Sequence, residues 1–236
     1  MLTGIFGALG SGKTLLLVYL AYIQKYTHKK IIIANFQLSF ADIVESAEEM
    51  ILKMDEYEKK YKRKICFVID ELGGILKATD FMQSSNEIMA DICLKSRKRK
   101  IDIIYTAQHH MMVDRMVRRI TDVAYYPTFN IKRQTISISP REFDGEVWLK
   151  GEPFSFNPPD YYKYYDTDEV IYPNKEAIVK WYIAKSLTEE KMLIQLANES
   201  KISEQKKIVK WVLDVGGELA EALLREMKDS GILSSH

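Results

Sequence analysis

The sequence predicts an α/β fold in which helices cover both faces of a mostly parallel β-sheet. Three observations indicate this fold: short apolar runs alternate with longer segments of helical periodicity, the first run opens into a glycine-rich loop, and the third ends in two acidic residues. The alternation favours a three-layer arrangement, because each parallel pair of strands needs a crossover connection. We expect this domain to span residues 1–160 and a smaller, strap-like and helical unit to span residues 161–236.

The first strand and the first helix flank the glycine-rich loop. Residues 2–6 form a short apolar run, which is typical of a buried strand. Residues 13–26 contain no helix breaker and are apolar on nearly every side, so we expect a helix buried against the sheet. The β-branched run 31–34 predicts a second buried strand. Residues 43–61 place apolar side chains at helical spacing beneath a charged outer face, which predicts an amphipathic helix.

Three more strands are predicted further along the chain. The apolar runs 65–69 and 101–106 predict the third and fourth strands, and residues 123–126 predict the fifth. Helices are expected between these strands, over residues 86–99 and over the short basic segment 111–120. These elements complete the mostly parallel sheet.

The remaining chain changes character. Residues 135–139 and 146–149 alternate apolar and polar side chains, which predicts an antiparallel pair at the sheet edge. We expect the proline- and tyrosine-rich residues 156–167 to clamp over the core domain, in preference to stacking on bases. Residues 175–230 have only helical patterns. The helix that begins at Glu218 carries too many carboxylates to read a DNA groove, so we assign it a packing or subunit-contact role.

Composition limits the classes of function. The chain has 236 residues, 47% of them apolar, and a formal net charge of +1, so a packed core is expected and nucleic-acid binding would rest on local patches. Cys66 and Cys93 lie in apolar segments without metal or disulfide spacing, which favours core thiols in a reducing compartment. The apolar run 15–23 is too short to cross a bilayer and no leader pattern precedes it, so we expect a cytoplasmic protein without a membrane span.

A complete phosphate-loop pattern, G-x-x-x-x-G-K-[ST], lies between the first strand and the first helix. Glycines allow successive backbone N–H groups to point at one anion, and the following helix directs its positive end at the phosphates. We expect Lys13 to reach the β- and γ-phosphates of ATP and the Thr14 hydroxyl to bind Mg²⁺. The predicted nucleotide-binding residues are Gly7, Ala8, Leu9, Gly10, Ser11, Gly12, Lys13 and Thr14. The alternative is a chance glycine turn.

Polar side chains follow the third and fourth predicted strands. Asp70 and Glu71 end the third strand, where a carboxylate points into the crevice that binds ligands in parallel sheets. We expect Asp70 to hold the magnesium ion with its bound water, and Glu71 to act as general base. Gln108, just past the fourth strand, is predicted to contact the γ-phosphate or the attacking water. His109 and His110 are interpreted as loop surface.

Basic residues are concentrated between residues 95 and 119. The cluster consists of Lys95, Arg97, Lys98, Arg99, Lys100, Arg115, Arg118 and Arg119. One of these arginines could reach the γ-phosphate of a neighbouring subunit as a finger. Other members could line a channel that follows a DNA backbone without reading bases. For each single residue, a solvated helix face is the alternative.

Together, the phosphate loop, the strand that ends at residues 70–71 and the segment 96–108 resemble the HerA/FtsK superfamily of P-loop ATPases. In that family a basic helix end, often Gly-Arg-Lys, precedes an apolar strand that ends in Thr-Gln. Residues 97–98 match the Arg-Lys pair, whereas Ser96 replaces the glycine and Ala107 is inserted into the Thr-Gln pair.

The resemblance implies a RecA-like sheet in the order 5-1-4-3-2, counting the predicted strands along the chain. Members of the superfamily form rings that move double-stranded DNA. The resemblance therefore implies a homo-oligomer, a hexamer or pentamer, that hydrolyses ATP with Mg²⁺, completes its site with Arg97 and translocates DNA without sequence specificity. Within the superfamily the chain resembles viral genome-packaging ATPases, which implies capsid or vertex proteins as further partners and a transient location at the virion vertex.

Two other functions stay open. The ATPase domain of the Zot-type assembly proteins of filamentous phages is similar, and a protein of that type would bind a coat protein instead of duplex DNA. Stimulation of ATP hydrolysis by DNA separates these two functions. A small-molecule kinase would be monomeric and would transfer phosphate to an acceptor, but no arginine-rich lid follows an acceptor-binding segment in this sequence.

Overall fold

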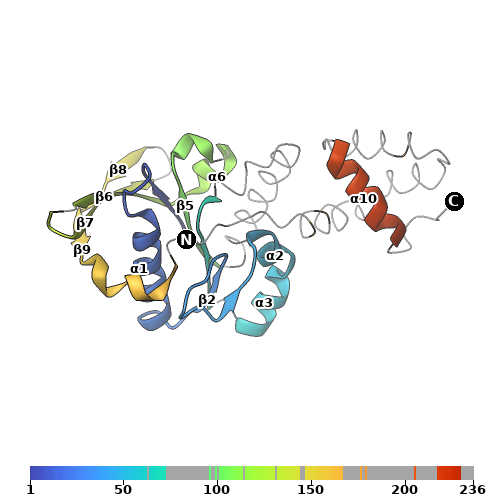
Figure 1. The fold of residues 1–236 in the computed structure, drawn as a ribbon, viewed down its shortest axis with the longest axis horizontal. Helices are drawn as coiled ribbons and strands as arrows, with labels where there is room; N and C mark the ends of the chain where they lie inside the picture. The colour runs from blue at the N-terminus through green and yellow to red at the C-terminus, as the bar shows by residue number, and fades with distance from the viewer. Residues whose placement is uncertain are drawn as a thin grey trace.

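The fold comes from a computed structural model of the chain. It describes residues 1–62, 64–72, 96, 99, 101–113, 115–130, 132–143, 147–166, 176, 179, 205 and 217–229. Within these residues a nine-stranded sheet carries helices on both of its faces (Figure 1).

The sheet has the predicted strand order. Its strands are β1 (Leu2–Phe6), β2 (Ile31–Ala34), β3 (Ile43–Val44), β4 (Ile65–Ile69), β5 (Asp102–Ala107), β6 (Val123–Asn130), β7 (Thr135–Phe143), β8 (Trp148–Lys150) and β9 (Phe154–Phe156). They lie in the order β3-β2-β4-β5-β1-β6-β7-β8, and β9 pairs with β7. The strands from β3 to β6 are parallel, whereas β7 is antiparallel to β6, β8 and β9. The order 5-1-4-3-2 and the antiparallel edge are both confirmed.

Two apolar cores lie on opposite faces of the sheet, as a three-layer fold requires. On one face the helix α1 (Lys13–Tyr26) buries Leu16, Leu17 and Val18 against side chains of β1, β2 and β4. On the other face the helices α2 (Ala47–Leu52), α3 (Met54–Tyr61) and α6 (Arg115–Ile120) pack on the alternate side chains of the same strands. Because successive strand residues point to opposite faces, strands that are apolar throughout serve both cores.

The helix α1 is covered on its other side by residues 156–166, here called the tyrosine strap. The strap contains two 3₁₀ turns, η3 (Pro158–Asp160) and η4 (Tyr162–Tyr164). The ring of Tyr19 stacks on that of Phe156 with centroids 4.4 Å apart, and the rings of Tyr22 and Tyr164 are 5.6 Å apart. The helix α1 is apolar on nearly every side because it packs between the sheet and the tyrosine strap. The contacts agree with the expected clamp over the core.

Residues 43–61 form a strand and two helices, so the prediction of one continuous helix is wrong. Ile43 and Val44 continue the sheet as β3, paired in parallel with β2. The helix α2 begins after Ser46, whose hydroxyl accepts a hydrogen bond of 3.2 Å from the backbone N–H of Glu49. Lys53 separates α2 from α3 with φ −94° and ψ 3°. Apolar spacing alone does not distinguish the two residues of a short edge strand from the first turn of a helix.

Two other predicted helices are described only in part. In the basic segment 111–120, a 3₁₀ turn, η2 (His110–Met112), precedes α6. Of the predicted helix over residues 86–99, the described residues Ser96 and Arg99 are helical, and the rest lies outside the described part of the chain.

The helix α10 (Gly217–Asp229) agrees with the helix predicted from Glu218 onward. It buries one face, formed by Ala220, Leu223, Leu224 and Met227, at the spacing of an amphipathic helix. In Figure 1 it lies apart from the sheet. The proposed division of the chain near residue 160 stays a prediction.

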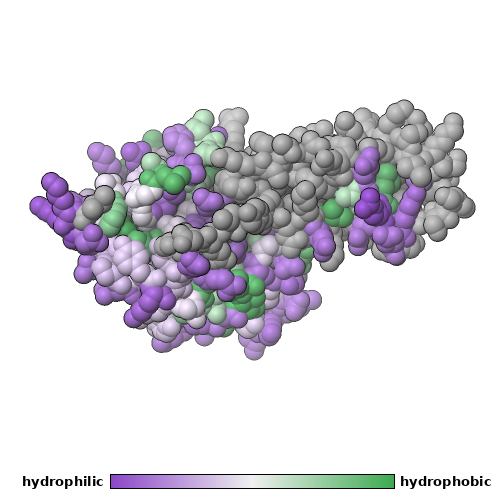
Figure 2. Space-filling model, in the orientation of Figure 1, coloured by the Kyte–Doolittle hydropathy of each residue, from purple (hydrophilic) through white to green (hydrophobic). Residues whose placement is uncertain are grey.

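The surface of the described part is mainly hydrophilic in the view of Figure 2, with hydrophobic atoms confined to small areas. Cys66 is a free, fully buried cysteine, and burial raises the pKa of its thiol to about 12. Cys93 lies outside the described residues. Within the described ranges, no helix combines the length and the apolar character that a membrane span requires.

Candidate active site

The phosphate loop leaves β1 and enters α1 in a conformation that needs glycine. Gly10 and Gly12 have φ of 74° and 90°, in the left-handed region that L residues rarely adopt. A Cβ on Gly12 would also lie 2.7 Å from Cδ1 of Ile136, so the loop is seated closely against β7. The hydroxyl of Ser11 is buried without a hydrogen-bond partner among the described residues, which suits a loop that receives an oxyanion.

Lys13 lies across the mouth of this loop. Its Nζ donates a hydrogen bond of 3.0 Å to the carbonyl oxygen of Ala8. Burial lowers the pKa of its ammonium group, and the negative charges of Asp70 and Glu71 oppose that shift. The Lys13 ammonium group, held in this partly desolvated loop, is placed to bind an anion. A bound anion would raise the pKa of Lys13 again.

Asp70 joins the loop to the end of β4. The hydroxyl of Thr14 donates a 3.0 Å hydrogen bond to Oδ2 of Asp70, and the hydroxyl of Thr106 donates a 2.5 Å hydrogen bond to Oδ1. Burial raises the pKa of this carboxyl, and the two threonine hydrogen bonds lower it. The hydroxyl and carboxylate oxygens of Thr14 and Asp70 therefore meet at one point. Oxygen donors of this kind fit a magnesium ion.

Two further residues fix the backbone around Asp70. The side chain of Asn35, directly after β2, donates to the carbonyl oxygen of Asp70 at 3.0 Å and accepts from its backbone N–H at 2.7 Å. The hydroxyl of Thr106, on β5, also accepts a 2.8 Å hydrogen bond from the backbone N–H of Glu71. Neither residue belongs to a sequence motif that would predict it as part of the site. The only signal was their position at the carboxyl ends of apolar runs.

Glu71 adopts an uncommon backbone conformation. Its φ is 50°, in the left-handed region, and such a conformation in a non-glycine residue costs about 1–3 kcal/mol. The hydrogen bond to Thr106 holds this turn in place. The exposed side chain lines the same pocket as Lys13 and Asp70. Its placement suits a group that contacts solvent water beside bound phosphate.

These residues line one open pocket of about 420 Å³. Beyond the phosphate loop, its wall carries aromatic rings from three parts of the chain: Phe36, Phe129, Tyr162 and Tyr165. The strap reaches the pocket because Tyr165 pairs with Leu38 in an isolated β-bridge. Burial raises the pKa of the Tyr165 hydroxyl to about 12, with smaller contributions from Tyr162 and Asp70. The strap is predictable from the sequence, but its approach to this pocket is not.

The structure describes only one of the two remaining predicted catalytic residues. Gln108 follows β5 and is exposed, and it is not among the residues that line the pocket. Arg97 lies outside the described residues. The roles assigned to both remain predictions.

The strand order and the loop together decide the fold family. The phosphate loop follows β1, the acidic pair follows β4, and β5 lies between these two strands. The chain has the P-loop NTPase fold. This arrangement brings two sequence motifs, separated by about fifty residues, to one edge of the sheet.

The solved structures that are similar to the chain include the following two. The N-terminal domain of zonular occludens toxin from Neisseria meningitidis aligns with a TM-score of 0.47 and 16% identity, over 70% of this chain and 98% of that one. The KaiC-like protein PH0186 from the hyperthermophilic archaeon Pyrococcus horikoshii OT3 aligns with a TM-score of 0.45 and 10% identity, over 64% and 89% of the two chains. No family model matches this chain, and no curated protein does.

Replacement of Asp70 by asparagine is expected to raise the melting temperature of the magnesium-free protein by a few degrees near neutral pH. The change removes a buried negative charge, while an amide can still hydrogen-bond to Thr14 and Thr106. The pKa of Asp70 is higher in the folded protein than in the unfolded chain. As the pH falls through the folded-state pKa, protonation of Asp70 therefore stabilises the wild type. The difference from the variant should therefore narrow in acid.

Thermal unfolding across a pH series measures this difference. The control is the Asp160→Asn variant, which changes an exposed carboxyl and should match the wild type at each pH. Two results would contradict the burial of an ionised carboxyl at Asp70. One is a melting temperature of Asp70→Asn below that of the wild type, and the other is a difference between their melting temperatures that widens in acid.

Proposed function

We propose that the protein binds Mg·ATP in the pocket between the phosphate loop and β4 and hydrolyses it. The observation that carries this proposal is the convergence of Lys13, Thr14, Asp70 and Glu71 on one pocket, with Thr14 and Asp70 in direct hydrogen-bond contact. A phosphate loop without the acidic pair would support nucleotide binding alone. The carboxylates add the groups that hydrolysis requires.

Each residue has a separate task. The backbone of the loop and Lys13 bind the phosphates, and Thr14 and Asp70 would hold the magnesium ion. When bound, this ion neutralises the negative charge that develops on the phosphate oxygens. Glu71 accepts a proton from the attacking water and orients it. The aromatic wall formed by Phe36, Phe129, Tyr162 and Tyr165 lies where the remainder of a nucleotide can extend from the loop.

We extend the proposal to an oligomeric motor that couples hydrolysis to movement of duplex DNA, in the manner of HerA/FtsK and viral genome-packaging ATPases. The motif from Ser96 to Gln108 supports this assignment, as do the basic side chains of Arg118 and Arg119 on α6, of which Arg119 is exposed. Such a ring, a hexamer or pentamer, would act in the cytoplasm of the host and dock on capsid or vertex proteins. Arg97 from a neighbouring subunit would complete each ATP site.

Rescue between two inactive variants tests the neighbouring-subunit role of Arg97. We expect Arg97→Ala and Glu71→Gln each to abolish ATP turnover, because each removes one component of a shared site. A mixture should regain partial activity, since some interfaces then combine an intact Glu71 with an intact Arg97. Phosphate release from mixed subunits measures this recovery, and a mixture of Glu71→Gln with Lys13→Ala is the control because both changes affect the same side of the interface. Failure of the first mixture to recover removes the finger role from Arg97.

Stimulation of ATP turnover by duplex DNA tests the motor. The proposal expects faster hydrolysis with DNA and binding that weakens steeply with salt, because phosphate contacts release counterions. ATP hydrolysis without either effect would favour a Zot-type assembly factor that engages a coat protein. A monomer that transfers phosphate to an acceptor would indicate a kinase.

A further inference from the structure

A second cavity lies on the face of the sheet opposite α1. Its volume is about 340 Å³, and none of its lining residues is shared with the nucleotide pocket. Phe6 and Ala124, which line the cavity, belong to the apolar core on the side of α2, α3 and α6. The cavity is therefore a separate site, and neither the phosphate loop nor the acidic pair contributes to it.

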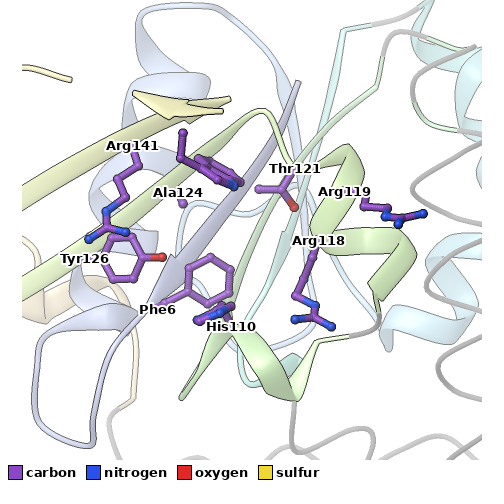
Figure 3. A pocket seen from close by; sticks show the side chains of 9 residues that line it. Phe6, His110, Arg118, Arg119, Thr121, Ala124, Tyr126 and Arg141 are labelled. Atoms are coloured by element: carbon purple, nitrogen blue, oxygen red, sulfur yellow. The ribbon is translucent and has the colours of Figure 1, made fainter. Parts of the chain in front are cut away.

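Three arginines give this cavity a positive character. Arg118 and Arg119 project from α6 on one side of the aromatic rings, and Arg141 lies on the other side, with its guanidinium 4.9 Å from the ring centroid of Tyr126 (Figure 3). No carboxylate is among the described side chains that line the cavity. A ligand that matches this lining carries negative charge.

Among the described residues, Arg118 in particular has no strong acceptor. Its Nη1 contacts the sulfur of Met111, a weak acceptor, at 2.7 Å, and its Nε is buried without a partner among the described residues. A buried donor left unpaired is unfavourable, and phosphate oxygens satisfy a guanidinium well. Burial, and then the neighbouring His109, Arg118 and Arg141, lower the pKa of the His110 imidazole, which disfavours its charged form.

The remaining wall of the cavity is aromatic. The ring centroids of Phe6 and Tyr126 lie 5.8 Å apart, and those of Phe6 and His110 lie 6.4 Å apart in a T-shaped arrangement. Trp148 on β8 also lines the cavity and is 40% exposed, an unusual state for so large an apolar side chain. A partly exposed indole beside arginines is suited to stacking on a planar ring.

We propose that this cavity binds one unpaired nucleotide of a DNA strand, with the base against Trp148 and Tyr126 and the phosphate on Arg118. The inference rests on the proposed DNA partner and adds to the duplex that the motor would move a contact with an unpaired nucleotide. A duplex presents phosphates on its outside and keeps its bases stacked, so it can meet the arginines but cannot fill an aromatic cavity without unpairing a base. Single strands combine both contacts, because aromatic stacking accepts any base.

Fluorescence anisotropy with labelled oligothymidylate, in the absence of ATP, tests the aromatic part of the site. We expect Trp148→Ala to weaken binding about 10-fold, because base stacking on one aromatic side chain contributes on this scale. Leu149→Ala is the matched control, since Leu149 is the next residue of β8, is 53% exposed and does not line the cavity. It should bind like the wild type.

The salt dependence of the same binding tests the phosphate contact. Arg118→Gln should reduce the slope of log affinity against log salt by about 0.7, the contribution of one phosphate contact to a single strand. Trp148→Ala should leave this slope unchanged. Arg225→Gln, which alters an exposed arginine of α10, should change neither slope nor affinity. Basal ATP turnover without DNA should be the same in Trp148→Ala, Leu149→Ala and Arg225→Gln as in the wild type.

Three outcomes overturn the proposal, and a fourth separates it from the proposed motor. Unchanged oligothymidylate binding by both Trp148→Ala and Arg118→Gln removes the cavity from DNA binding. Equal affinity for thymidine monophosphate and the oligonucleotide would assign the cavity to a free nucleotide. Loss of basal ATP turnover in Arg118→Gln would place that arginine in catalysis. Tight single-strand binding without any DNA stimulation of hydrolysis would leave the cavity assignment intact and contradict only the motor.

Discussion

Replacement of Lys13 by alanine is expected to reduce ATP turnover about 1000-fold and to weaken ATP binding at least about 10-fold. Lys13 is the cation of the phosphate loop, and its ammonium group is held across the loop by the carbonyl oxygen of Ala8. Loss of this charge leaves only the magnesium ion and the loop N–H groups to offset the repulsion between the bound phosphates and the carboxylates of Asp70 and Glu71. Turnover is measured by phosphate release, and affinity by titration with a fluorescent ATP analogue.

The fold should survive this change, so the result can be attributed to the site. Lys13 makes one hydrogen bond to the loop, and its ammonium group is already disfavoured by burial. We expect a melting temperature within a few degrees of the wild type. Lys59→Ala, which changes an exposed lysine of α3, should retain full activity. Wild-type ATP affinity in the Lys13 variant would contradict the assigned role.

The Glu71→Gln variant is expected to retain ATP and to lose about 100- to 10,000-fold in turnover. Glutamine preserves the size of the side chain and the backbone turn held by Thr106, but it cannot accept a proton from water. The variant should therefore trap unhydrolysed ATP, unlike Lys13→Ala, which should release it. Analysis of nucleotide that remains with the protein after gel filtration distinguishes the two.

Glu152→Gln provides the control for Glu71→Gln, because Glu152 is an exposed glutamate outside the pocket lining. It should turn over ATP at the wild-type rate and retain none. If Glu71→Gln also hydrolyses ATP at the wild-type rate, another group must activate the water, and the exposed position of Glu71 beside the pocket would have no catalytic meaning.

The parallel part of the fold could be predicted because its strands are apolar throughout. Runs such as 31–34 and 65–69 serve cores on both faces of the sheet, so their sequence carries a continuous signal. The short edge strand β3 could not be recognised in this way. Ile43 and Val44 also fit the spacing of the following helix, and only pairing with β2 identifies them as a strand.

The candidate site was predictable to the extent that its residues form local motifs. Lys13 and Thr14 are specified by the loop pattern, and Asp70 by its place after an apolar run. Asn35 and Thr106 are single polar residues that acquire a role only when β2 and β5 flank β4 in the sheet. The aromatic wall combines Tyr162 and Tyr165 of the strap with Phe36 and Phe129. The strap could be predicted as a clamp over the core, but no local pattern indicated that its tyrosines reach this pocket.

The phosphate loop and the carboxylates are proposed to bind one Mg·ATP together. Isothermal titration calorimetry tests this proposal most directly, by comparing the effect of Mg²⁺ on ATP affinity in the wild type and in Asp70→Asn. Because Asp70 contacts the Thr14 hydroxyl, the two are placed to hold a single ion. We predict that Mg²⁺ strengthens ATP binding several-fold in the wild type and leaves the affinity of Asp70→Asn unchanged. An equal effect of Mg²⁺ on both proteins would show that the ion binds elsewhere and would contradict the proposed site.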